Sequence, residues 1–177
     1  MMKRTICLIL AALLVSTLFG CHYSESGDIL EPVSFYYPRK TTNFVYGSGD
    51  GVLTSEMREA SGHTGDLDYL LSMYLRGPQD SGLRTPFPTG CKLIDVRTSN
   101  DTLTVVLSAE FTILENTERT LACAGLAKTC FALAEVQYVR IEAETEERIV
   151  SMTLYESALL LADYRAFEVP SATEKPQ

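Results

Sequence analysis

Histidine is scarce in this sequence, and its cysteines form no Cys-x-x-Cys pair. The two histidines, His22 and His63, lie far apart in the chain. Structural zinc sites are built mainly from cysteine and histidine ligands at close spacing. The chain therefore offers few ligands for such a site, and we expect neither a metal ion nor a cofactor.

Basic residues are also in the minority. Lysine and arginine number 15 against 23 aspartates and glutamates, which gives a formal net charge of −8. Proteins that bind nucleic acids neutralise phosphates with clustered lysine and arginine, so we expect no nucleic-acid partner. The same deficit argues against a polybasic patch that would hold the protein on anionic lipid.

The apolar run from Ile6 to Phe19 is shorter than the roughly 20 residues that a membrane-spanning helix needs. Lys3 and Arg4 precede the run, as in the positively charged start of a secretory signal. We therefore expect residues 1–20 to be a signal peptide. Its removal would leave 13 basic side chains against 23 acidic ones, formally −10.

The end of this run resembles the bacterial lipoprotein signal. Leu18, Gly20 and Cys21 match that pattern, in which the cysteine receives a diacylglyceryl group and becomes the first residue of the mature protein. Stable anchoring takes more than one acyl chain, and the resemblance implies two or three on Cys21. They would hold the protein on the outer face of the cytoplasmic membrane. The alternative is a plain secreted protein in which Cys21 is incidental.

Composition divides the rest of the chain into three parts. Residues 21–32 contain serine, glycine and acids without periodicity, so we expect a lipidated cysteine followed by a flexible tether. Residues 33–169 are enough for one hydrophobic core, and we expect a single domain there. Residues 170–177 are polar and contain two prolines, which predicts a disordered tail.

Three cysteines remain in the expected domain: Cys91, Cys123 and Cys130. Cys123 and Cys130 are two helical turns apart, a rise of roughly 10 Å, and this is too far for a direct disulfide. We expect buried thiols that act as small hydrophobic side chains. A disulfide between Cys91 and one of the other two is the alternative.

Hydrophobic periodicity and turn signals predict a succession of hairpins and helices. Asp66 is expected to cap the first helix, and Gly77-Pro78 to end it. The second helix is expected to start near Asn116 or Thr117 and to bury a narrow stripe of small side chains. The expected strands are 33–37, 43–46, 52–59, 91–97, 103–108, 136–143 and 149–155, and the expected helices are 66–76, 116–134 and a short one at 156–163.

Because consecutive strands form hairpins, a parallel doubly wound sheet is excluded. The predicted class is α+β, with two helices packed on one face of a mixed, mostly antiparallel sheet in the order ββαββαβ. Five groups of residues follow one another in a characteristic order and spacing. They are Leu70-Leu71 with Leu75-Arg76-Gly77-Pro78, Gly82-Leu83, Pro86 to Leu93, Leu103 to Phe111, and Thr129 ahead of Val136 and Val139.

Together these segments resemble the GerMN domain of sporulation and germination lipoproteins, over about Val33 to Tyr155. The resemblance implies a ring-building-type fold with its core between Asp66 and Ala143. It also implies work outside the membrane of spore-forming, Gram-positive bacteria, in assembling the channel between mother cell and forespore or in germination. The implied partners are other envelope or sporulation proteins, and the implied role is docking without catalysis. We expect the docking surface around the second helix and the strand 103–108.

Two enzymatic alternatives can be written from the residues. Ser108 with His63 and either Asp95 or Glu110 would form a catalytic triad, but no Gly-x-Ser-x-Gly elbow surrounds Ser108. Ser108 is better explained as a polar strand end. We therefore expect no enzyme.

Glu56 and Glu59, with Arg58 between them, would form a second catalytic arrangement, a pair of carboxylates. We expect instead that these charges form a solvated strand edge.

A binding module is the remaining alternative. Tyr36, Tyr37, Phe44 and Tyr46 could form an aromatic surface for peptide or peptidoglycan, because aromatic side chains contribute large contact areas at low entropic cost. Core and cross-strand packing explain the same residues equally well.

Overall fold

The structure is a computed structural model that describes residues 32–41, 51–60, 62–157 and 159. The expected signal peptide, Cys21, the tether before residue 32, the expected strand 43–46 and the expected tail lie outside these ranges. The expected division of the chain into signal, tether, one domain and tail therefore stays a prediction. Most of the expected helix 156–163 also lies outside them.

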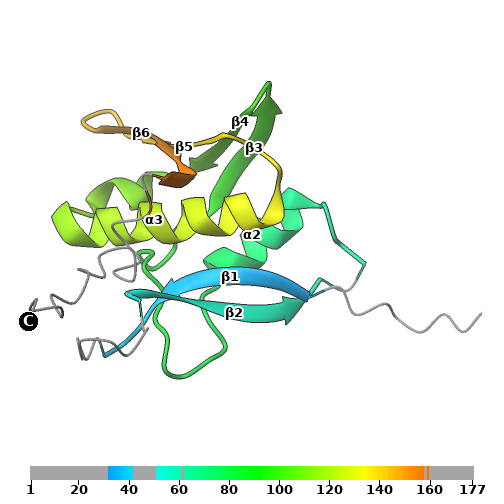
Figure 1. Ribbon diagram of the computed structural model, residues 1–177. Helices are drawn as coiled ribbons and strands as arrows, with labels where there is room; N and C mark the ends of the chain where they lie inside the picture. Colours follow the sequence, from blue (N-terminus) through cyan, green and yellow to red (C-terminus); the bar gives the residue numbers. More distant parts are fainter. Residues whose placement is uncertain (1–31, 42–50, 61, 158, 160–177) are drawn as a thin grey trace, which may run out of the picture.

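The described chain has the predicted α+β class. Its elements lie in three layers, with the helices between two groups of strands (Figure 1). The elements are β1 (Pro32–Pro38), β2 (Leu53–Glu59), α2 (Leu67–Leu75), β3 (Leu93–Ser99), β4 (Thr102–Leu107), a 3-10 helix (Ala109–Ile113), α3 (Asn116–Leu133), β5 (Tyr138–Glu144) and β6 (Ile149–Tyr155).

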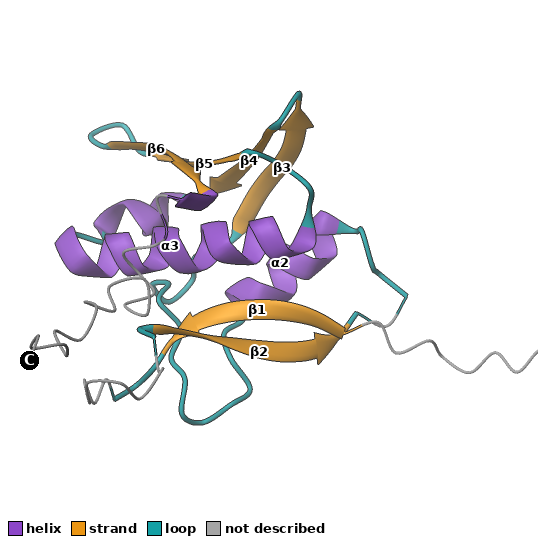
Figure 2. Ribbon diagram, viewed as in Figure 1, coloured by secondary structure: helices purple, strands orange, loops and turns teal. Residues whose placement is uncertain are grey.

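The strands form two sheets where the sequence predicted one. β1 and β2 make an antiparallel pair, and β3-β4-β5-β6 make a mixed sheet in which β4 and β5 run parallel (Figure 2). The other edge of β1 meets helices instead of a strand. Tyr36 N donates to Thr129 Oγ1 at 2.9 Å, and Tyr74 Oη donates to Tyr36 O at 2.8 Å. Side chains of α2 and α3 thus satisfy backbone groups that a neighbouring strand would otherwise pair.

Helix α3 is buried on more sides than its sequence predicted. The narrow stripe expected for this helix widens to an almost continuous buried stretch, because one side of α3 packs on β1 and another on β5 and β6. Small side chains allow this close approach of two sheets. The buried residues are Ala122, Cys123, Ala124, Gly125, Leu126, Ala127, Thr129 and Cys130.

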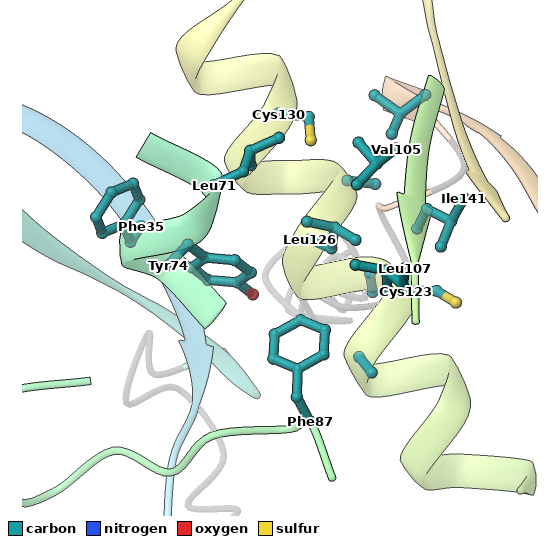
Figure 3. Close-up of a cluster of buried hydrophobic side chains, with 14 of the residues drawn as sticks. Phe35, Leu71, Tyr74, Phe87, Val105, Leu107, Cys123, Leu126, Cys130 and Ile141 are labelled. Carbon is teal, nitrogen blue, oxygen red and sulfur yellow. The ribbon is translucent and has the colours of Figure 1, made fainter. Parts of the chain in front are cut away.

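Aromatic rings fill the core between α2 and the hairpin of β1 and β2. Tyr74 stacks on Tyr37 with ring centroids 4.7 Å apart and contacts Phe35 at 5.7 Å. Its other neighbour is Phe87, at 5.4 Å in an edge-on arrangement, and Leu126 of α3 lies nearby (Figure 3). Because Tyr37 Oη donates to Tyr74 O at 2.7 Å, this hydroxyl is buried together with an acceptor.

The ends of the first helix follow the sequence prediction. Asp66 Oδ1 accepts a hydrogen bond from Tyr69 N at 3.0 Å, and this bond holds the pKa of the Asp66 carboxyl below its ordinary value. Gly77 follows the helix with φ of 93°, a left-handed conformation that favours glycine. The second helix differs, because Glu115 precedes it without a side-chain capping bond and Asn116 has φ of 48°.

The charges of β2 are not the solvated edge that the sequence predicted. The side chains of Arg58 and Glu56 are only 6% and 10% exposed, and Arg58 Nη2 lies 2.5 Å from Glu56 Oε1. Arg58 Nη2 also donates to Gly77 O at 2.6 Å, while Glu56 Oε2 accepts from the backbone of Gln79 and Asp80. This ion pair connects β2 to the end of α2.

Candidate docking surface

Cys21 lies outside the described residues, so its lipidation stays a prediction. In the described ranges, neither α2 nor α3 is long and apolar enough to cross a membrane.

The proposed triad is not assembled among the described residues. Ser108 Oγ donates to Glu110 Oε2 at 2.5 Å, and this bond lowers the pKa of the Glu110 carboxyl. A carboxylate of lowered pKa is a weak base, poorly suited to take a proton from serine. His63 instead contacts Asp66 at 3.3 Å and stacks on Tyr69, with ring centroids 3.8 Å apart.

Asp95 has a different partner as well, since its carboxylate accepts from Arg97 Nη1 at 2.6 Å. The four residues considered for a triad are thus divided among separate local contacts. Over the same described residues, no three His, Cys, Asp or Glu side chains gather closely enough to hold a metal ion.

The three cysteines of the described chain are free thiols. Cys123 and Cys130 are buried and Cys91 is half-buried. Burial raises the pKa of Cys91 and of Cys123 to about 11, and it raises the pKa of Cys130 further. They are protonated at neutral pH, and the two on α3 pack in the core, as the sequence predicted.

Only Tyr36 and Tyr37 of the expected aromatic surface are among the described residues, and they differ in burial. Tyr37 belongs to the core and is fully buried. Tyr36 is half-buried, and Lys128 Nζ lies 4.8 Å from its ring centroid. Phe44 and Tyr46 lie outside the described residues.

The structure narrows the expected docking surface around α3 and β4. Residues 122–127, 129 and 130 of α3 are buried between the two sheets, and β4 is an internal strand whose Leu103, Val105 and Leu107 are in the core. A partner therefore cannot contact most of either element. The surface that is open instead is the face of the four-stranded sheet that points away from α3.

No described element covers this outer face (Figure 2). Side chains of alternate residues in β3 to β6 point outward, while Val139, Ile141 and Ala143 point into the core. Arg97 of the edge strand β3 lies 2.6 Å from Asp95 of the same strand and 3.0 Å from Glu142 of β5. Arg140, the partner of Thr153 in the register, donates to its hydroxyl at 3.4 Å.

One end of the outer face is aromatic. Tyr138 and Tyr155 are directly opposite each other on β5 and β6, and both are exposed. Tyrosine and arginine are enriched in protein interfaces, where they supply large contact areas and multiple donors. The alternation of 136–143 located the buried residues of β5, and the same alternation could have located Tyr138 and Arg140 on the opposite face.

A polar cleft of about 480 Å³ lies where the start of α3 meets the turn between β5 and β6. Arg119 donates through Nε to Leu114 O at 2.8 Å, and Arg148 Nη1 lies 3.4 Å from Glu115 Oε1. The cleft is lined by the guanidinium groups of Arg119 and Arg148 and by the carboxylates of Glu115 and Glu147, so its formal charges cancel. The lining residues are Thr112, Glu115, Asn116, Arg119, Glu147, Arg148, Ile149 and Val150.

Fold and surface together define an α+β domain with an open, tyrosine- and arginine-bearing sheet face. The chain belongs to the Germane family, described as sporulation and spore germination, whose model matches residues 34–148. This match confirms the resemblance to GerMN domains. No curated protein matches the sequence.

Two solved structures are similar to the described fold. A putative lipoprotein from Clostridium perfringens is 15% identical with a TM-score of 0.46, and the match covers 75% of this chain and 92% of that one. The tandem GerMN domains of the sporulation protein GerM from Bacillus subtilis are 18% identical with a TM-score of 0.48. That match covers 68% of this chain and 41% of the tandem protein.

Proposed function

We propose that this protein is an extracytoplasmic lipoprotein, anchored through Cys21 to the outer face of the cytoplasmic membrane of a Gram-positive bacterium. Its domain docks to other proteins of an envelope assembly used in sporulation or germination, and it has no catalytic role. The lipoprotein signal at residues 18–21 supports the anchor. Membership of the Germane family supports the link to sporulation and germination.

The open outer face of the β3-β4-β5-β6 sheet is the observation that best supports docking. It brings two arginines and two exposed tyrosines onto one surface, with acidic partners at one end. The arginines can make directional hydrogen bonds to a partner, and the tyrosine rings provide an area from which a partner can exclude water. A protein partner suits this face better than a small molecule, which would need a concave apolar pocket.

Cross-linking in intact cells tests the proposal. The protein is recovered from membranes of growing and sporulating cells, with Cys21→Ala as the unanchored control. We expect partners that appear in sporulating cells and disappear in the control. Equal partners in both growth states would refute the sporulation assignment, and unchanged recovery of Cys21→Ala from membranes would refute the lipid anchor.

Surface variants test the docking face. Arg140→Glu and Tyr138→Ala should each reduce the cross-linked partner without lowering thermal stability, because both side chains are exposed. Arg76→Glu is the matched control, since it makes the same charge change on an exposed residue at the end of α2. Equal recovery of partners for Arg140→Glu, Tyr138→Ala and Arg76→Glu would exclude the outer face.

A further inference from the structure

β6 is an edge strand without charge. Its sequence, IVSMTLY, has no charged residue and no proline, and it consists mainly of β-branched, aromatic and other apolar residues. β6 ends the order β3-β4-β5-β6, and no described strand pairs with its outer edge. Such edges are templates for pairing with another strand, and proteins usually protect them with charges, prolines or bulges.

The other sheet edges have that protection. β3, at the opposite end of the sheet, contains Asp95 and Arg97 and has a register shift between Leu93 and Asp95. On β2, Glu59 is an exposed charge, and Glu56 and Arg58 are bonded to residues at the end of α2. The edge of β1 that faces away from β2 forms hydrogen bonds with side chains of α2 and α3. Among the described edges, β6 is therefore the unprotected one.

β6 also exposes apolar side chains at both ends. Ile149 is 73% exposed and Tyr155 is 51% exposed, whereas Val150 of the same strand is buried. Ile149 and Tyr155 are six residues apart, so they project from the same face of the strand. Met152 lies midway between them.

We propose that β6 pairs antiparallel with β6 of a second copy of this chain, about a two-fold axis at Met152. In this register Ile149 of each copy lies opposite Tyr155 of the other, and Ser151 lies opposite Thr153. Aromatic with β-branched pairs and hydroxyl pairs are favourable cross-strand neighbours. In this register Ile149 and Tyr155 of one copy each gain a neighbour from the other copy. The same strand forms both halves of the contact, as an isologous interface requires.

Charges beyond the strand select this register. Arg148 directly precedes the strand and Glu156, the start of a 3-10 turn, directly follows it, so in this register Arg148 of each copy comes near Glu156 of the other, twice in the dimer. Both side chains are exposed. Arg148 Nη1 lies 3.4 Å from Glu115, and a guanidinium has further donors for a second carboxylate.

The neighbouring registers are worse. Moving the axis to Ser151 brings Glu156 toward Glu146, in the turn before β6, so that two like charges approach each other. Moving it to Thr153 brings Glu156 opposite Val150, whose side chain is buried. A register slip by one residue would place Ile149 of one copy and Tyr155 of the other on different positions of the pleat, so that they no longer lie opposite each other. The result of pairing at Met152 is a continuous eight-stranded sheet with α3 of both copies on the same side.

Disulfide trapping in the full-length chain tests this geometry. Chains with Ser151→Cys and chains with Thr153→Cys, bearing different tags, are produced together and oxidised mildly in native membranes. Opposed residues in an antiparallel pair have Cβ atoms about 4.5–5.5 Å apart, close enough to form a disulfide after a small adjustment. We expect mixed disulfide dimers. Each variant produced alone is the matched control, because identical positions are not opposed in this register.

Charge reversal tests the register separately. Arg148→Glu should weaken dimerisation about tenfold, since two attractive pairs become repulsive, and Glu156→Arg should do the same. The double variant Arg148→Glu with Glu156→Arg should restore it, which a role of Arg148 within one copy would not explain. Circular dichroism melting confirms that each variant is folded.

Two results would overturn the proposal. One is that mixed and single-variant samples give equal amounts of disulfide dimer. The other is that the double charge reversal stays as weak as the single variants. Both readouts concern contacts between copies of this chain, so they can fail while the docking function and the lipid anchor stand, and the converse is also true.

Discussion

Gly125 is the residue at which α3 and the hairpin approach most closely. A Cβ atom on this glycine would lie 2.9 Å from the backbone oxygen of Tyr36 and 2.9 Å from Tyr74 Oη. One of these contacts is with backbone, which cannot rotate away as a flexible side chain can. Glycine is therefore required here for space, because its φ lies outside the left-handed region.

Gly125→Ala should destabilise the protein by about 1–3 kcal/mol, because the added methyl group forces β1 and α3 apart or displaces the Tyr74 hydroxyl. Urea unfolding followed by circular dichroism measures the change. Gly82→Ala is the matched control, since Gly82 is exposed and its neighbour is the Asp80 carboxylate. Equal stability of the two variants would contradict the close approach.

The buried thiols give a second prediction for single residues. With a pKa of about 11, Cys123 is a thiolate in roughly one molecule in a thousand at pH 8. Its alkylation by iodoacetamide should therefore be slow in the folded protein and fast in guanidinium chloride. Mass spectrometry of the Cys123 peptide measures both rates, with a cysteine introduced on an exposed loop, Ser81→Cys, as the control. Rapid labelling of Cys123 in the folded protein would contradict its burial on α3.

At the scale of elements, the ion pair of Glu56 and Arg58 joins β2 to the end of α2. Arg58 donates to Gly77 O, its guanidinium carbon lies 5.3 Å from the centre of the Phe35 ring, and Glu56 accepts from Gln79 and Asp80. The side chains of Arg58 and Glu56 are largely removed from water, whereas Gln79 and Asp80 are exposed. A buried pair of this kind contributes little relative to apolar residues, but removing one partner leaves an uncompensated charge.

Glu56→Gln should therefore cost about 3 kcal/mol, because it leaves the Arg58 charge buried without its counter-ion. The double variant Glu56→Gln with Arg58→Met should be more stable than Glu56→Gln alone. Thermal unfolding measures both, and Glu59→Gln, on an exposed residue of the same strand, should change stability by less than about 0.5 kcal/mol. The buried-charge explanation would be contradicted if the double variant lost as much stability as Glu56→Gln and Arg58→Met lose separately, added together.

Local signals located most elements, because Asp66, Gly77 and the alternation of 136–143 act through neighbouring residues. The division into two sheets was not predictable in this way, since it depends on Thr129 and Tyr74 reaching the backbone of Tyr36 across long sequence separations. The same is true of Glu56, whose burial follows from the position of α2.

Part of the candidate docking surface could also be predicted from the sequence. The outward residues of β5 follow from the same alternation that predicts its core face. What the sequence alone could not show is which face of α3 is free. Small residues such as Ala124 and Gly125 predict close packing without indicating that it occurs on two sides.

For the whole molecule, α3 makes one core out of two sheets. A two-stranded hairpin is marginally stable by itself. Here β1 packs on α3, and α3 also packs on β5 and β6. Because α3 packs on both sides and its fully buried Leu126 lies in one cluster with Tyr74 and Leu107 (Figure 3), the hairpin should not open without exposing the core face of the larger sheet.

Native-state hydrogen exchange should therefore give the same free energy of opening for the most protected amides of β1 and of β5, equal to the global free energy of unfolding. Leu126→Ala should lower both values together by about 2–5 kcal/mol, because it removes contacts on a fully buried residue shared by the two layers. Val150→Ala, at the far edge of the sheet, should lower both by a smaller amount. Exchange of β1 amides at a clearly lower free energy than those of β5 would mean that the hairpin is a separate unit, with α3 belonging to the four-stranded sheet alone.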